Sequence, residues 1–259
     1  MKTLFLAWLD PIARRWYPVG RLRNNQGEYE FRYTEGALSA RKEAGFQPLA
    51  AFPELTATYR SPELFALFSN RLLPRSRPDY REFIEWLHIP ESEVEPFVIL
   101  ARSGGRRATD TFEVFPEPQV DENGIAVLHF FVHGIRHSSE GAVQRAELLV
   151  AGERLLLMHD LQNPHDPSAL ALRTGASSPG DFHLLGFCPR YISEEVLPVV
   201  EEHPERVQVE VAHVNPPPAP AQMRVLCSMR LPLGVTPGLF RGRKYLPLNE
   251  QAEPALKAG

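Results

Sequence analysis

The sequence predicts an α+β fold in two parts: an N-terminal module of a small β-meander plus helices, then a small β-barrel with one helix. Proline accounts for 25 of the 259 residues, about twice its usual share, which disfavours long helices. After residue 120, short strand-like runs recur at roughly 8–15-residue spacing, as in small barrels. Eight of the nine histidines also fall between His129 and His213, so the two halves differ in composition.

Composition excludes several classes of protein. Hydrophobic residues make up 43% and charged residues 23%, which is ordinary globular usage and unlike a fibrous or disordered chain. The net charge of −4 excludes a generally basic nucleic-acid coat but not a local binding site. Residues 211–249 contain no acid and include five basic residues, namely Arg224, Arg230, Arg241, Arg243 and Lys244.

Membrane association and secretion are not expected. No apolar run approaches the ~18 residues that a membrane helix needs. The only cysteines are Cys188 and Cys227, and no export signal is recognisable, so we expect a reducing, cytoplasmic environment. Both cysteines are expected in the core rather than as a redox pair.

The first part begins with strand signals. Apolar or alternating runs at residues 3–9, 16–22 and 29–33 predict a meander, and Asn24-Asn25-Gln26-Gly27 has turn chemistry. Helices are predicted from an N-cap at Ser61 to about Leu72, from Asp79 to Leu87, and over residues 92–100. A strand follows at 111–115.

Residues 116–124 have linker composition, and the second part follows as a series of strands. Strands are predicted at 125–132, 169–172, 183–187, 207–214 and 223–231, with two further runs within 146–158. A helix is predicted to start at Ser193 with an acidic first turn, and residues 216–220 form a polyproline connector. The predicted domains are therefore 1–118, a linker at 119–124, 125–246, and a flexible tail at 247–259.

The sequence contains none of the common enzyme signatures. It has no phosphate-binding P-loop, nucleophile elbow, C-x-x-C or H-E-x-x-H motif. His129 and His133 lie four residues apart without a third metal ligand at matching spacing, so structural histidines are the favoured interpretation. Residues 103–107 could hold an anion, although a solvated turn is favoured. We therefore predict no catalytic residues, no metal and no cofactor.

Three motifs in residues 134–191 resemble the HIRAN domain. They are Gly134-Ile135-Arg136-His137, then Asn163-Pro164-His165-Asp166 with Ala169 following, and Leu185-Gly186-Phe187-Cys188-Pro189 with Arg190-Tyr191 following. The resemblance covers about half of the chain. It implies an OB-like barrel and, as in the best understood HIRAN domains, binding of single-stranded DNA at a free 3′ end.

Physical chemistry supports part of that expectation. A guanidinium such as that of Arg136 can contact a phosphate or a base face. The rings of His137 and His165, where the family often has tyrosine, can stack on bases. Asn163 and Asp166 can hydrogen-bond base edges or a terminal hydroxyl. The full predicted nucleic-acid site is Arg136, His137, Asn163, His165, Asp166, Arg190 and Tyr191. Alternatively, Asn163 and Asp166 form an Asx-type turn and do nothing else.

The first part resembles the N-terminal subdomain of HipA-type toxin kinases. The similarity lies in Val19-Gly20-Arg21-Leu22, in Phe31-Arg32-Tyr33, and in the helix end at Asn70-Arg71-Leu72-Leu73-Pro74. In some relatives this subdomain is a separate chain that restrains the kinase. The resemblance therefore implies an antitoxin-like alternative, in which residues 1–118 dock on a separate kinase or other protein. A structural platform without a partner is the remaining interpretation.

Overall fold

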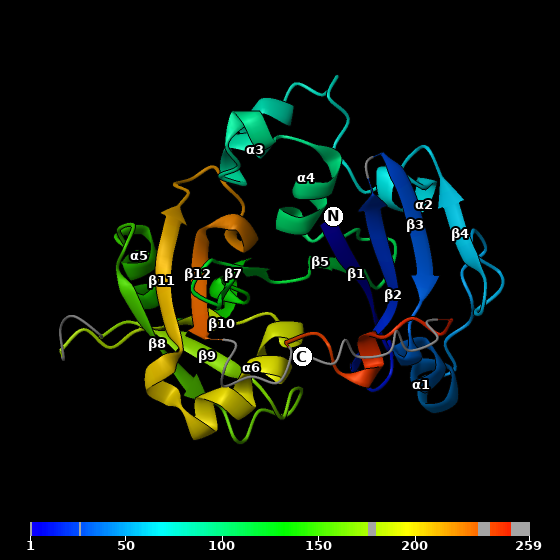
Figure 1. Cartoon of the computed structure of the whole chain (residues 1–259). Coiled ribbons are helices and arrows are strands. Elements are labelled where there is room, and N and C mark those ends of the chain that lie inside the picture. The colour runs from blue at the N-terminus through cyan, green and yellow to red at the C-terminus, as the bar shows by residue number, and fades with distance from the viewer. Residues whose placement is uncertain (1, 26, 176–179, 233–238, 250–259) are drawn as a thin grey trace. The chain divides into compact units, whose positions relative to one another are not determined.

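The structure, a computed structural model, describes residues 2–25, 27–175, 180–232 and 239–249 (Figure 1). Contacts group the chain into two compact units. Unit 1 comprises residues 1–73, 95–117 and 241–259, and unit 2 comprises residues 74–94 and 118–240. The chain thus passes between the units after residues 73, 94, 117 and 240. These units differ from the predicted domains because 74–94 groups with the second part and the C-terminal segment with the first.

Unit 1 contains a five-stranded antiparallel sheet in the order β4-β3-β2-β1-β5. Its strands are β1 (Lys2–Leu9), β2 (Trp16–Asn25), β3 (Glu28–Tyr33), β4 (Thr58–Ser61) and β5 (Phe112–Pro116). The predicted meander is confirmed as β1, β2 and β3. Gly20 lies where a Cβ atom would come within 2.4 Å of the Phe31 ring, so a side chain at this position would clash with the core.

The helices of unit 1 differ from prediction in three places. The helix α1 (Glu35–Ala44) was not predicted, and α2 is only the four residues Ala66–Ser69. The helix α4 (Pro96–Ser103) begins at Pro96 rather than at Ser92, since proline suits the first helical position but not the interior. The first residues of the predicted helix instead form the short 3₁₀ turn η1 (Glu91–Glu93), which belongs to unit 2.

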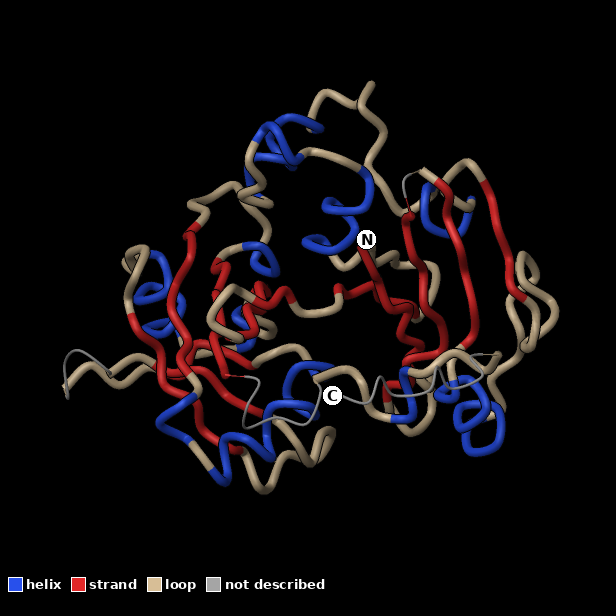
Figure 2. Tube along the Cα trace, viewed as in Figure 1, coloured by secondary structure: helices blue, strands red, loops and turns tan. Residues whose placement is uncertain are grey.

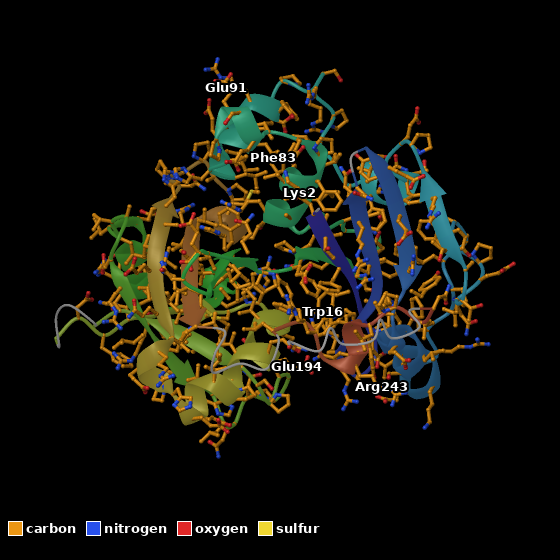
Figure 3. The ribbon with its side chains drawn as sticks, viewed as in Figure 1. Lys2, Trp16, Phe83, Glu91, Glu194 and Arg243 are labelled. Atoms are coloured by element: carbon orange, nitrogen blue, oxygen red, sulfur yellow. The ribbon has the colours of Figure 1, made fainter. Side chains whose placement is uncertain are left out.

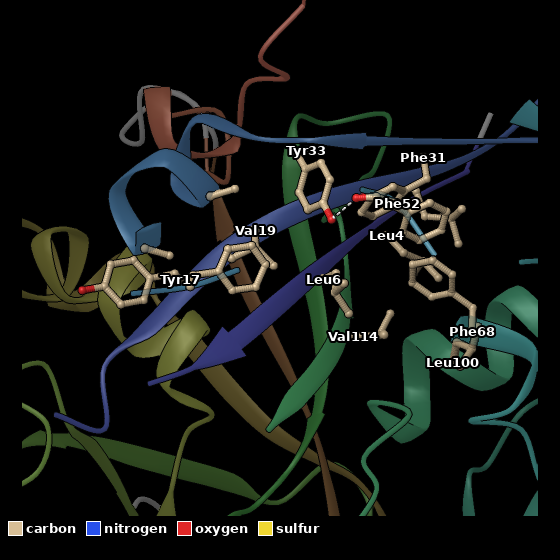
Figure 4. Packing of buried hydrophobic residues seen from close by; sticks show 14 of the residues in the cluster. Leu4, Leu6, Tyr17, Val19, Phe31, Tyr33, Phe52, Phe68, Leu100 and Val114 are labelled. Atoms are coloured by element: carbon tan, nitrogen blue, oxygen red, sulfur yellow. Dashed lines mark hydrogen bonds between the residues drawn. The ribbon is translucent and has the colours of Figure 1, made fainter. Parts of the chain in front are cut away.

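Aromatic rings fill the core of unit 1 (Figure 4). The Phe31 and Phe52 rings stack with centroids 4.1 Å apart, and Phe68 lies 6.0 Å from Phe31. The buried Tyr33 hydroxyl donates to the Phe52 carbonyl at 2.7 Å and accepts from the Leu49 amide at 2.7 Å. Both polar functions of this phenol are therefore satisfied, as burial requires.

The C-terminal segment of unit 1 lies against its N-terminal strands. The turn η6 (Arg243–Tyr245) places the Tyr245 ring 5.0 Å from the Phe5 ring. The Leu248 amide then donates to the Tyr33 carbonyl at 3.0 Å. Residues 250–259 of the predicted tail lie outside the described residues.

Unit 2 contains a seven-stranded antiparallel sheet in the order β10-β9-β8-β11-β12-β7-β6 (Figure 2). Its strands are β6 (Gln119–Val120), β7 (Ile125–Phe131), β8 (Arg154–His159), β9 (Leu170–Arg173), β10 (Leu184–Phe187), β11 (Gln208–Val214) and β12 (Val225–Pro232). Among the described residues, β10 and β6 are the two ends of this sheet. The OB-like barrel therefore stays a prediction, whereas a mixed fold with two antiparallel sheets is confirmed.

Within the predicted linker, Gln119 and Val120 form the strand β6 and pair with β7. The first of the two runs predicted within 146–158 is not a strand. The first residues of this run, 146 and 147, are instead the last two residues of the helix α5 (Glu140–Glu147). Ser139 is the N-cap of this helix.

The second part has more than the one helix predicted. One is α5, and the other is α6 (Arg190–Glu202), which starts three residues before the predicted Ser193. Arg190 therefore occupies its first turn, and Ser193 is buried rather than a cap. Short 3₁₀ turns are η2 (Ile135–His137), η3 (Pro204–Arg206) and η4 (Ala221–Met223).

Residues 74–94 belong to unit 2 through contacts far apart in the sequence. This segment carries α3 (Tyr80–Trp86) and η1, on which Figure 3 labels Phe83 and Glu91. The buried Asn215 amide donates to the Trp86 carbonyl at 2.8 Å and to the Met223 carbonyl at 2.7 Å. The His88 and His213 rings stack with centroids 4.3 Å apart. Across the described residues, no helix is both long and apolar enough to cross a membrane.

Candidate nucleic-acid interface

A polar turn joins β8 to β9. The Asp160 amide donates to the Ala169 carbonyl at 2.9 Å and closes this turn. Inside it, Asn163 Oδ1 accepts from the amides of His165 and Asp166 at 3.0 and 3.1 Å. Asn163 Nδ2 donates to Asp160 Oδ2 at 2.9 Å. The Asn163 side chain thus holds the backbone of the turn, as the Asx-turn alternative predicts.

Asp166 connects this turn to α6. Its Oδ1 atom accepts from the Ser168 amide at 3.0 Å, and its Oδ2 atom lies 3.6 Å from Arg190 Nε. That separation exceeds a direct hydrogen bond, so Oδ2 keeps the capacity to accept another donor. The Asp166 side chain is 16% exposed and that of Arg190 is 28% exposed. The pair is accessible at the N-terminal end of α6, whose dipole adds positive potential.

Arg136 and His137 lie on η2, which begins four residues after the end of β7. Gly134 precedes them with φ of 83°, a conformation that favours glycine. Both side chains are exposed, and Arg136 Nε donates to His137 Nε2 at 2.9 Å. The Arg136 guanidinium and the His137 ring are therefore held next to each other at the surface.

Strand β10 joins these two parts of the site. His133 and Phe187 exchange backbone hydrogen bonds of 2.9 Å in both directions, and the Ser138 hydroxyl donates to the Leu185 carbonyl at 3.0 Å. The chain then continues from Phe187 to Arg190. The structure thus brings Asp166 and Arg190 into contact and places η2 beside the strand that leads to them.

The remaining predicted residues lie on the same turn and on the same helix. His165 is exposed on the turn, and Tyr191 is half-buried on α6. Sequence reasoning missed Asp160 and His159, although they precede Asn163 by only three and four residues. The His159 ring lies 2.9 Å from the Pro167 carbonyl through Nε2 and 3.7 Å from Glu201 through Nδ1. It therefore ties the turn to the C-terminal end of α6.

The acid-free segment is not an open basic surface. Arg224 pairs with Glu147 at 2.6 Å and Arg230 pairs with Asp121 at 3.1 Å. Arg241, Arg243 and Lys244 belong to unit 1 rather than unit 2, and residues 233–238 lie outside the described residues. These ion pairs leave the segment less positive than its composition predicts.

The other candidate sites have structural explanations. Burial raises the pKa of both Cys188 and Cys227, which makes them poor nucleophiles. In residues 103–107, the Gly104 and Gly105 amides donate within the turn, to the Leu100 carbonyl and the Ser103 hydroxyl. In the described part of the chain, no group of three His, Cys, Asp or Glu side chains could hold a metal ion.

A family comparison identifies most of the second part of the chain. Residues 125–234 match the family model of the HIRAN domain. The predicted resemblance is therefore confirmed over these residues, which cover strands β7 to β12 and the whole polar site. The predicted resemblance of residues 1–118 to the HipA N-terminal subdomain stays a prediction.

Two solved structures resemble part of this chain. One is the crystal structure of the HIRAN domain of human HLTF, with 14% identity, 42% of this chain and 80% of that chain covered, and a TM-score of 0.30. The other is the crystal structure of a protein from Lactobacillus plantarum, with 19% identity, coverage of 41% and 96%, and a TM-score of 0.32. No curated protein matches the chain significantly. Because both TM-scores are low, the HIRAN assignment depends on the family match alone.

Proposed function

We propose that this chain is a non-catalytic protein that recognises single-stranded DNA, or a free 3′ DNA end, through its HIRAN domain. The observation that carries the proposal is the polar site within the matched residues, where Asn163 holds a turn that presents Asp166 to Arg190. Arg136 and His137 are exposed on η2, and His165 is exposed on the same turn as Asp166. Such a mixture of cations and flat rings suits a single strand, whose bases are free to stack.

Asp166 is the group that would read the end of the strand. A terminal 3′ hydroxyl can donate a hydrogen bond to Oδ2, the carboxylate oxygen that Ser168 does not use. A terminal phosphate has no such donor at neutral pH and would be repelled by the carboxylate. Arg190, which is 3.6 Å away, can contact a phosphate further along the strand.

The proposal includes no catalytic step. Asp160 and Asp166 accept hydrogen bonds within the turn, and burial raises the pKa of both cysteines. A cytoplasmic location, predicted from the two cysteines, remains part of the proposal. Docking of residues 1–118 on a HipA-type kinase or another protein remains the alternative.

A titration with labelled oligonucleotides tests the leading proposal. The same single strand is compared with a 3′ hydroxyl, with a 3′ phosphate and as a blunt duplex. We expect the hydroxyl-ended single strand to bind about ten- to a hundredfold more tightly than the phosphate-ended one, the value of one charged hydrogen bond. Equal affinity for all three would contradict end recognition and favour the kinase-docking alternative.

A further inference from the structure

The outer face of strands β8, β9 and β10 carries apolar side chains in register. Leu156 and Leu184 flank Arg173 in one row across the three strands, and Met158 and Phe187 flank Ala171 in the next row. We call this surface the outer strip and define it, with the preceding Phe182, as Leu156, Met158, Arg173, Phe182, Leu184 and Phe187.

Alternation along β8 and at the start of β10 explains why Met158 and Leu184 face away from the core. Leu155 and Leu185 are 3% and 0% exposed, whereas Met158 is 39% and Leu184 38% exposed. Side chains on successive strand positions point to opposite faces. The outer strip is therefore an apolar surface that the described residues of unit 2 leave partly open.

A cation and an aromatic ring lie together at one end of the strip. The Arg173 guanidinium carbon is 4.9 Å from the centroid of the Phe182 ring, which is cation–π geometry. The Phe182 side chain is 57% exposed. Arg173 also donates to the Thr174 carbonyl at 3.0 Å, and no carboxylate of the described residues forms an ion pair with it.

The acids near Arg173 lie against other cations and do not neutralise its charge. Asp181, next to Phe182 in the chain, pairs with Arg145 at 2.8 Å. Glu210 on β11 is aligned with the exposed Arg154 of β8 rather than with Arg173. The outer strip thus combines exposed apolar and aromatic side chains with an unneutralised guanidinium.

We propose that the outer strip is a second part of the nucleic-acid interface, on which bases further from the strand end stack. An exposed ring beside an unpaired cation suits a strand that offers both base faces and phosphates. The strip is also continuous with the candidate site, because its member Phe187 pairs with His133 and precedes Arg190 by three residues.

This inference rests on the proposed function but makes a separate prediction. End recognition depends on the turn that carries Asp166, whereas the strip depends on the bases of interior nucleotides. A strand whose interior positions lack bases keeps its phosphates and its end. Comparing this strand with the normal one therefore isolates stacking on the strip.

The test uses two labelled single strands of about 12 nucleotides, within the usual range for one small nucleic-acid-binding domain. One is normal, and the other has abasic sugars except at its two 3′-terminal positions. We expect Phe182→Ala to weaken binding of the normal strand about five- to a hundredfold, the range for loss of one aromatic stacking platform. Binding of the abasic strand should not change, and Phe182→Trp should retain the native affinity for the normal strand.

Two further variants complete the experiment. Arg173→Gln should also weaken binding of the normal strand. Val120→Ala, which is 46% exposed on β6 at the other end of the sheet order, should leave it unchanged. Because Phe182 is exposed, Phe182→Ala should keep the circular dichroism spectrum and melting temperature of the native protein.

The proposal for the outer strip would be contradicted if Phe182→Ala bound the normal strand with native affinity. It would also be contradicted if the variant lost the same affinity for both strands. Failure of end recognition gives a different pattern. In that case the native protein would not distinguish 3′ hydroxyl from 3′ phosphate, while the dependence on Phe182 and on interior bases would persist.

Discussion

The Asp166 carboxylate and the Arg190 guanidinium lie 3.6 Å apart, from Oδ2 to Nε. This pair connects the turn between β8 and β9 to the first residue of α6. Under the proposed function, opposite charges at one accessible position would distinguish two ligand groups. The carboxylate would accept from a hydroxyl, and the guanidinium would contact a phosphate.

Asp166→Asn should reduce end discrimination more than overall affinity. Asparagine keeps an oxygen that can accept from the Ser168 amide, so the turn should survive, but the charge that repels a terminal phosphate is lost. We expect the affinity ratio between hydroxyl-ended and phosphate-ended strands to fall about tenfold or more. Titration of both strands measures this ratio.

Arg136→Ala serves as the matched comparison for this prediction. Its guanidinium is exposed on η2 and reads no strand end, so both strands should weaken to the same extent. If Asp166 only holds the turn, Asp166→Asn will leave the ratio unchanged, whatever its effect on the melting temperature. That result would contradict end recognition by Asp166.

Asn163→Ala should destabilise unit 2 and weaken binding of every strand. The substitution removes the acceptor of two backbone amides and the donor to Asp160. Leaving such groups without their partner typically costs about 1–3 kcal/mol. Urea unfolding would measure the loss, and the exposed neighbour substitution Gln162→Ala should show none. Equal stability of the two variants would mean that the turn is held by its backbone alone.

Much of the strand pattern was predictable, because it follows from local alternation. Strands β9, β10, β11 and β12 lie within one or two residues of their predicted bounds. The helix α5 was not predicted because its sequence contains Gly141 and buries only Ala142 and Ala146. Its clearest sequence signal is the capping residue Ser139 before Glu140.

Long-range contacts explain what the sequence could not predict. Asn215 bonds to Trp86, 129 residues away, so no local pattern places 74–94 with the second part. The site shows the same division. The Asx-type bonds of Asn163 were predictable as one of two alternatives, whereas the pairing of Asp166 with Arg190 depends on how β9, β10 and α6 come together.

Removal of residues 74–94 should loosen one end of unit 2. A fragment of residues 121–248 lacks the Trp86 carbonyl that accepts from Asn215 and the His88 ring that stacks on His213. We expect amide hydrogens of residues 215–224 to exchange faster in this fragment than in the full chain, because locally lost contacts lower local stability. Amides in the paired strands β8 and β9 are the internal control. Equal exchange at 215–224 would show that the segment contributes nothing to unit 2.

Nucleic-acid binding should weaken only gently with salt. Arg224 and Arg230 are in ion pairs, so phosphate contacts would come from few residues, such as Arg136, Arg173 and Arg190. Two or three neutralised phosphates predict a slope of about −2 for log affinity against log salt concentration on a single strand. Titrations at several salt concentrations measure it. A slope steeper than about −5 would require a long basic groove.

The stability of unit 1 should fall as pH rises through the range in which Glu113 titrates. This side chain is 4% exposed on β5, with Arg106 Nε 3.9 Å away. Burial raises its pKa from 4.5 to about 7, and the nearby Arg106 only partly opposes this. The folded state thus binds the Glu113 proton more tightly than the unfolded state does.

The direction of the pH effect follows from this difference in proton binding. Below pH 4.5 the carboxyl is protonated in both states, so the shift has no effect on stability. Between pH 4.5 and about 7 the unfolded state ionises first, and unfolding becomes progressively easier. At roughly 1.4 kcal/mol per pKa unit, the total loss is about 3 kcal/mol above that range.

Glu113→Gln should remove this pH dependence, since glutamine resembles the protonated acid and cannot ionise. Urea unfolding followed from below pH 4.5 to above pH 7 should give equal stability for native protein and variant at the acidic end. At the alkaline end the variant should be more stable by up to about 3 kcal/mol. Glu54→Gln, at an exposed position, should retain the native pH profile. A native profile that is flat across this range, or that rises with pH in parallel with Glu113→Gln, would show that the buried carboxyl does not ionise at a cost to folding.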